Sequence, residues 1–110
     1  MDGIYVGYFT GTGGNGVGMF VLREGVLTGA DAMGTLYDGK YLLTAEGYSF
    51  RARVKLQPNI RTVQGTNTGE DGFSYDATFD LPRDPESQPF FALTTPLGPV
   101  NVKLQKLRGI

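Results

Sequence analysis

Carboxylates are the side chains of this sequence with the clearest capacity for chemistry. Glycoside hydrolysis needs two carboxyl groups held about 5–10 Å apart in a cleft. The acidic residues available for such a pair are Asp31, Asp38, Glu46, Glu70, Asp71, Asp76 and Asp80. Most of them fall at expected turns or on the polar side of a strand, where aspartate bonds to its own backbone. We therefore expect no catalytic residue and no enzyme.

Asp31 differs from the other acidic residues because it lies at a strand end beside a corner glycine, Gly34. A carboxylate in that place typically accepts hydrogen bonds from nearby backbone N–H groups. We expect this structural role for Asp31 in preference to a catalytic one.

Histidine and cysteine are both missing from the chain. Imidazole and thiolate metal sites, cysteine nucleophiles and histidine-based triads are therefore excluded. We expect neither a metal site nor a cofactor. The absence of cysteine leaves the redox compartment open.

A glycine-rich segment, Gly11–Gly16, matches the G-x-G-x-x-G pattern of dinucleotide-binding loops. That fingerprint requires a helix directly after the loop, whose N-terminus holds the pyrophosphate. The segment is instead followed by Val17–Leu22, which has the composition of a strand. The pattern therefore predicts a flexible hairpin loop.

Length and charge narrow the class of protein. The 110 residues suit a single domain, residues 1–110, large enough for one core. A net charge of −1 gives no cationic surface for nucleic acid. We see no signal peptide and no apolar run near the ~20 residues of a membrane helix. We expect a cytoplasmic protein that binds neither nucleic acid nor membranes.

The elements that position these residues are short extended segments separated by turn signals such as Glu24-Gly25, Asp38-Gly39 and Glu46-Gly47. Extended segments are expected at residues 3–10, 16–23, 26–31, 35–38, 40–45, 48–56, 72–80, 90–95 and 99–107, which together give about eight strands. Such a meander protects its edges best by closing. The sequence predicts an all-β fold, an eight-stranded antiparallel up-and-down β-barrel.

Two segments, 48–56 and 72–80, alternate cleanly between apolar and polar residues and carry opposite charges. One antiparallel register would pair Arg51 with Asp80, Arg53 with Thr78 and Lys55 with Asp76. The connection between them, residues 57–71, is long for a compact β domain. It is either a mobile lid or contains one helical turn around residues 60–63.

The barrel interior offers the first candidate for a binding site. Eight-stranded barrels either fill with side chains or hold one small ligand. Both alternatives stay open here. The residues expected to point inward and to line a cavity, if one exists, are Phe50, Phe73, Tyr75, Phe79 and Phe91.

The first two strands are apolar on both faces, so one face would meet water in a monomer. A large exposed apolar patch usually marks an interface. We expect a homodimer built on these strands, with Tyr5, Phe9, Met19 and Val21 as interface candidates. The alternative is that the long loop or the C-terminal tail covers the patch.

Several motifs of the first 56 residues together resemble one family. They are Asp2-Gly3-Ile4-Tyr5, Gly16-Val17-Gly18, the run from Arg23 to Asp31, and Leu36-Tyr37-Asp38-Gly39-Lys40-Tyr41. This order is similar to the GrlR-type family of small bacterial lipocalin-like (calycin) barrels, named for a negative regulator of type III secretion genes. Ala30 replaces the second glycine of that family's Gly-Gly-Asp motif.

The resemblance implies an eight-stranded barrel that forms a homodimer and regulates by sequestering a protein partner. In the family's regulator an acidic loop makes that contact. The matching stretch here, residues 43–47, keeps only Glu46 as a candidate partner-loop residue. The leading hypothesis is a non-enzymatic regulatory protein that acts through protein–protein contacts. The alternative is a binder of a small apolar ligand inside the barrel.

Overall fold

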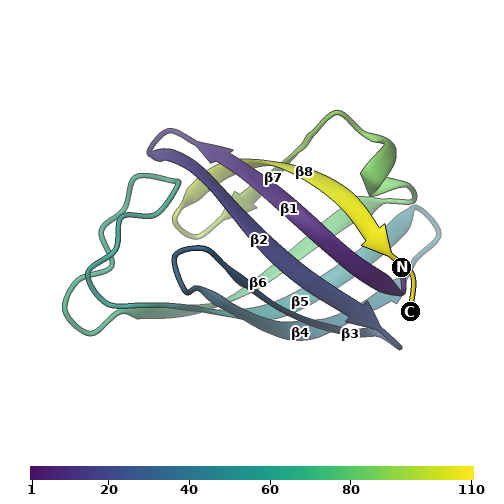
Figure 1. The fold of residues 1–110 in the computed structure, drawn as a ribbon, viewed down its shortest axis with the longest axis horizontal. Coiled ribbons are helices and arrows are strands. Elements are labelled where there is room, and N and C mark those ends of the chain that lie inside the picture. Colours follow the sequence, from purple (N-terminus) through teal and green to yellow (C-terminus); the bar gives the residue numbers. More distant parts are fainter.

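A computed structural model describes all 110 residues as one eight-stranded antiparallel sheet rolled into a nearly closed barrel (Figure 1). The elements are β1 (Gly3–Gly11), β2 (Gly14–Arg23), β3 (Val26–Asp31), β4 (Leu36–Leu43), β5 (Gly47–Leu56), β6 (Phe73–Pro82), the 3-10 turn η1 (Pro85–Ser87), β7 (Phe91–Thr95) and β8 (Gly98–Arg108). The predicted all-β, up-and-down barrel is confirmed. The fold contains no helix with the length and hydropathy needed to span a membrane.

The strand order is β6-β5-β4-β3-β2-β1-β8-β7, so the first strand pairs with the last, β1 with β8. β6 and β7 are the two edges of the sheet. One end of the barrel carries the β1–β2, β3–β4 and β7–β8 hairpins and the long β5–β6 connection, and we call it the loop end (Figure 1). The other end carries both chain termini, and we call it the terminal end.

The expected break at Asp38-Gly39 is wrong, because β4 runs without interruption from Leu36 to Leu43. Gly39 faces the neighbouring strand so closely that a Cβ atom there would overlap the carbonyl oxygen of Arg51. The glycine therefore permits close approach of two strands, one of the roles of glycine inside a sheet, and the Asp-Gly pair is no turn.

The register proposed for the fifth and sixth strands is wrong by two residues. In the structure Arg53 pairs with Asp76, Arg51 with Thr78 and Lys55 with Ser74. The Arg53 Nε donates to Asp76 Oδ1 at 3.2 Å, and both side chains are well exposed. Exposed ion pairs contribute about 0–1 kcal/mol, too little to fix a register against the packing of the inner face.

The long connection contains no helical turn around residues 60–63. Its backbone folds back on itself, with an isolated bridge between Arg61 and Asn67. The Thr62 N–H donates to the Thr66 carbonyl at 2.8 Å, and the Thr62 hydroxyl accepts from the Thr66 N–H at 3.1 Å. Local side-chain hydrogen bonds of this kind favour turns over helix.

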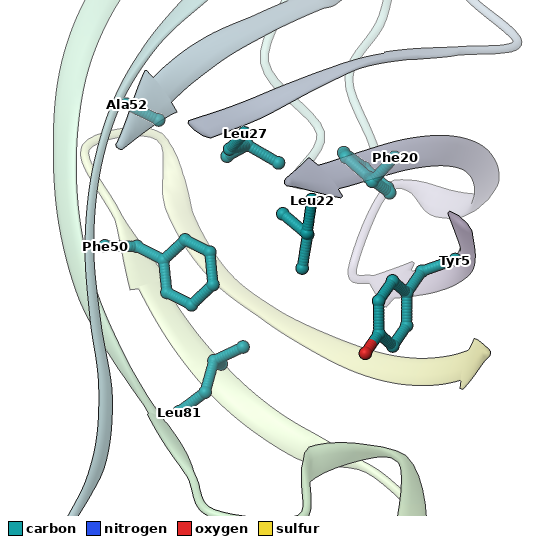
Figure 2. Packing of buried hydrophobic residues seen from close by; sticks show 7 residues of the cluster. All are labelled: Tyr5, Phe20, Leu22, Leu27, Phe50, Ala52 and Leu81. Carbon is teal, nitrogen blue, oxygen red and sulfur yellow. The ribbon is translucent and has the colours of Figure 1, made fainter. Parts of the chain in front are cut away.

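The core occupies the inner face of the barrel. Seven buried residues form its main cluster, namely Tyr5, Phe20, Leu22, Leu27, Phe50, Ala52 and Leu81. In Figure 2, Phe50 and Leu81 project from one wall toward Leu22 and Tyr5 on the opposite wall. The cluster covers the inner wall without filling the barrel.

Candidate functional site

A cavity of about 470 Å³ lies inside the barrel. Of the 33 residues that line it, 25 are hydrophobic, and they come from all eight strands and the long β5–β6 connection. Binding sites for small molecules typically have volumes of about 300–1,000 Å³ and mostly apolar walls. The interior is thus hollow on the scale of one small ligand.

Four of the five residues expected to line a cavity do so: Phe50, Tyr75, Phe79 and Phe91. Phe73 does not line it. It is the first residue of β6 and is 45% exposed, with its ring centroid 6.0 Å from that of Tyr75. The alternation placed Phe73 on the same face as Tyr75 but did not show that the strand begins beyond the cavity.

Aromatic rings pack edge and face around the cavity. Phe50 and Phe79 stack across β5 and β6 with centroids 5.1 Å apart and planes 3° from parallel. Phe20 meets Tyr37 edge-to-face at 5.1 Å. Such pairs contribute about 0.5–1.5 kcal/mol beyond their buried area, so these walls hold their shape without a ligand.

Several lining aromatics were missed from the sequence, chiefly Phe9, Phe20 and Tyr37. The available signal was alternation in 16–23, which places Phe20 and Leu22 on one face. That signal is weak because Met19 and Val21 make the opposite face equally apolar. In 36–41, the expected turn at Asp38-Gly39 hid the continuous alternation that brings Tyr37 inward.

The long connection packs against the loop end of the barrel. The Gly13 N–H donates to the Val63 carbonyl at 2.7 Å, and the Thr12 hydroxyl donates to the Gln64 carbonyl at 3.0 Å. The Gln64 side chain also donates to the Thr95 hydroxyl at 3.2 Å. Residues 60, 62, 63 and 64 line the cavity from this side. The Gln57 side chain donates to the Gly34 carbonyl at 3.0 Å. The segment therefore lines this end of the cavity and is tied to three hairpins by a few hydrogen bonds.

Asp31 fixes the corner between β3 and β4, as its sequence position predicted. Its Oδ1 accepts from the N–H groups of Met33 and Thr35, each at 3.0 Å. Its Oδ2 accepts from the Tyr37 hydroxyl at 3.0 Å. Both Asp31 and Tyr37 line the cavity. Burial, with the nearby Asp31 charge, raises the pKa of Tyr37 well above its ordinary value, so the phenol stays protonated and donates.

The interface candidates fall on opposite sides of the barrel wall. Tyr5 is 2% exposed, and both Tyr5 and Phe9 line the cavity. Met19 and Val21 face outward and are 54% and 36% exposed. Tyr5 and Phe9 are therefore removed from the candidate interface. Glu46 lies exposed in the β4–β5 turn at the terminal end.

The outward apolar residues of the first two strands form a continuous surface, which we call the outer stripe. Cross-strand pairing joins Ile4 with Val21, Val6 with Met19 and Tyr8 with Val17. Neither the long connection nor η1 covers this surface, because they pack at the loop and terminal ends (Figure 1). Tyr8, Val17, Met19 and Val21 are exposed, whereas Ile4 is partly buried and Val6 is only 8% exposed. The stripe is therefore open to solvent chiefly along β2.

No group of three or more acidic side chains is placed to hold a metal ion. No family model matches the chain, and neither curated proteins nor solved structures give a match. The resemblance to the GrlR-type family stays a prediction. The case for a function therefore rests on the cavity and the outer stripe.

Proposed function

We propose that this protein binds a small apolar ligand inside its barrel. The observation that carries the proposal is the hollow, largely apolar interior of about 470 Å³. Proteins pack their interiors to the density of organic crystals, and voids larger than a water molecule are few. An empty volume of this size lowers the stability of the protein, because the contacts of a filled core are missing. We infer that the volume is kept for a ligand.

The composition of the lining suits an apolar ligand. Each buried CH₂ group of a ligand gains about 0.8 kcal/mol on leaving water. A preformed site adds little ordering cost to this gain. The aromatic pairs Phe50–Phe79 and Phe20–Tyr37 hold the walls in place before binding.

The β5–β6 connection is the proposed gate. It lies at the loop end and is held there by hydrogen bonds that Gly13, Thr12, Gln57 and Gln64 donate. Four hydrogen bonds contribute about 1 kcal/mol each, so opening this segment costs far less than unfolding the barrel. The ligand would enter when the segment lifts from the hairpins.

A neutral fluorescent probe, N-phenyl-1-naphthylamine, tests the proposal directly. We expect saturable fluorescence enhancement with native protein. Ala77→Phe puts a ring into the cavity that Ala77 lines and should weaken probe binding by about tenfold or more. Thr78→Phe adds the same ring on the outer face of the same strand and should leave binding unchanged. Native protein that does not bind the probe would contradict the proposal.

The second candidate function is regulation through protein–protein contacts as a homodimer. The outer stripe supports it, since Tyr8 of β1 and Val17, Met19 and Val21 of β2 are exposed apolar side chains. This second candidate function includes two expectations from the sequence, the resemblance to the GrlR-type family and a cytoplasmic location. Both functions can coexist, because the cavity and the stripe lie on opposite faces of the same strands and share only Val17, at the loop end of β2.

Dimerisation is tested by placing a charge in the outer stripe. Val21→Lys should give a monomer in analytical ultracentrifugation where the native protein is a dimer, because an unpaired charge is costly in an apolar interface. Thr78→Lys, on the exposed outer face of β6, is the matched control and should leave the dimer intact. A monomeric native protein, or a Val21→Lys dimer, would contradict the candidate interface.

A further inference from the structure

The polar groups that line the cavity are not evenly spread. Those at the loop end lie at the start of β2, the end of β3, the β3–β4 turn, the start of β4, the start of β6, the end of β7 and the β5–β6 connection. They are Asn15, Asp31, Thr35, Tyr37, Thr62, Gln64, Tyr75, Thr94 and Thr95. The terminal end is lined chiefly by Leu22, Phe50, Leu81 and Leu104, with the Tyr5 hydroxyl as the polar exception. The cavity is therefore amphipathic along its length.

Asp31 is the only ionised side chain in the lining, which contains no lysine or arginine. A carboxylate has about four lone-pair positions. Three of them accept hydrogen bonds, two on Oδ1 and one on Oδ2. One position on Oδ2, beside the Tyr37 hydroxyl, remains for a donor from a ligand.

The phenols around Asp31 leave its charge uncompensated. Burial raises the pKa of Tyr75, and burial with the Asp31 charge raises that of Tyr37, so both rings are neutral at physiological pH. Neutral aromatic rings present a negative face that attracts cations. A single negative charge among such rings favours a cationic group and repels a carboxylate or phosphate.

We propose that the ligand is an amphiphilic amine, with its apolar body in the leucine- and phenylalanine-lined terminal end and its ammonium group at Asp31 Oδ2. This assignment rests on the proposed function. It deepens that function by naming the chemical class of the ligand and the orientation in which it binds.

Three compounds with one decyl chain and different head groups test the assignment: decylamine, decanol and decanoate. Each competes with N-phenyl-1-naphthylamine for the native protein below its micelle concentration. We expect decylamine to bind at least about tenfold more tightly than decanoate, with decanol between them. Decanoate binding as tightly as decylamine overturns the assignment while leaving the cavity function in place. Failure of the probe itself to bind overturns both.

Removing the charge of Asp31 tests whether this residue causes the preference for decylamine over decanoate. Asp31→Asn keeps the size and one acceptor of the side chain, and it should bring the affinities of decylamine and decanoate within about twofold of each other. Asp80→Asn removes the same charge from the exposed outer face of β6 and should keep the native preference. An Asp31→Asn protein that retains the native preference overturns the role of Asp31. The native ratio decides the ligand class even where the substitution prevents folding.

Discussion

The two ends of the barrel carry the same hydrogen-bonding arrangement in different surroundings. At the loop end Asp31 accepts from backbone N–H groups and from the Tyr37 hydroxyl. At the terminal end Asp2 Oδ1 accepts from the Glu24 N–H at 3.1 Å and from the Tyr41 hydroxyl at 2.9 Å. Both tyrosines belong to β4 and lie four residues apart, so one strand supplies a phenol to each end.

The two ends differ in how much solvent reaches their tyrosine hydroxyls. Burial raises the pKa of Tyr37 far above its ordinary value, whereas that of Tyr41 rises to about 12. Asp31 lines the cavity, and Asp2 does not. The same aspartate–tyrosine pair therefore holds an exposed corner at one end of the barrel and lines the cavity at the other end.

Removing each carboxylate should separate the ends most clearly. Asp31→Ala leaves the N–H of the buried Thr35 and the hydroxyl of the partly buried Tyr37 without their acceptor, so we expect the free energy of unfolding to fall by about 2 kcal/mol. Asp2→Ala should cost less, because water replaces the carboxylate at an exposed site. Urea denaturation measures both. Equal losses would show that the two pairs are equivalent.

The turn glycines provide the matched comparison. Gly34, beside Asp31, has φ of +83°, and Gly25, beside the Asp2 site, has φ of +79°. Alanine in this left-handed region costs about 1–2 kcal/mol. We expect Gly34→Ala and Gly25→Ala to lower the free energy of unfolding by similar amounts in the same denaturation experiment. A large difference between the two losses would show that the two ends differ in backbone strain and not only in the surroundings of their carboxylates.

Alkaline titration should distinguish the two tyrosines. The folded pKa of Tyr41, about 12, lies above its ordinary value of 10.0, so its contribution to stability is complete below pH 10 and is lost as pH rises through 12. Tyr41→Phe should remove a tyrosinate absorbance change near pH 12. Tyr37→Phe should remove one that appears only at higher pH, with unfolding. The reverse order would contradict the burial of Tyr37.

The smallest expected effect is on the stability of the protein at acidic pH. The hydrogen bond from Tyr41, then that from the Glu24 N–H, lowers the pKa of Asp2 below its ordinary value of 3.8. Its contribution to stability is therefore complete above that value and is lost as pH falls through the folded pKa. The stability difference between native protein and Asp2→Asn should be constant near neutral pH and shrink below pH 3.8. A difference that grows on acidification would contradict this arrangement.

Alternation predicted much of the fold and some of the site. Segments 48–56 and 72–80 are strands because one residue in two is apolar, and that pattern placed Phe50, Tyr75 and Phe79 on the inner face. It failed for Tyr5 and Phe9, where both faces of the strand are apolar and the pattern does not say which one faces inward.

Strand register and turn positions were the other features that the sequence pattern could not predict reliably. A shift of two residues returns every side chain to the same face, so alternation fits the proposed pairing of Arg53 with Thr78 and the observed pairing with Asp76 equally well. Asp38-Gly39 has the composition of a hairpin turn, yet Gly39 lies inside β4 because the neighbouring strand leaves no room for a Cβ atom. Both outcomes depend on contacts with strands distant in sequence.

The sequence by itself determined an all-β chain without histidine or cysteine, the positions of most strands, and the role of Asp31 at its corner. These follow from local patterns and from bonds between residues at most six apart. Only the tertiary structure decided that the interior is hollow, which face of β1 lines it, and that Asp31 is its one ionised side chain. Closure sets those properties, because volume and enclosure depend on how eight strands pack together and are not encoded in any one of them.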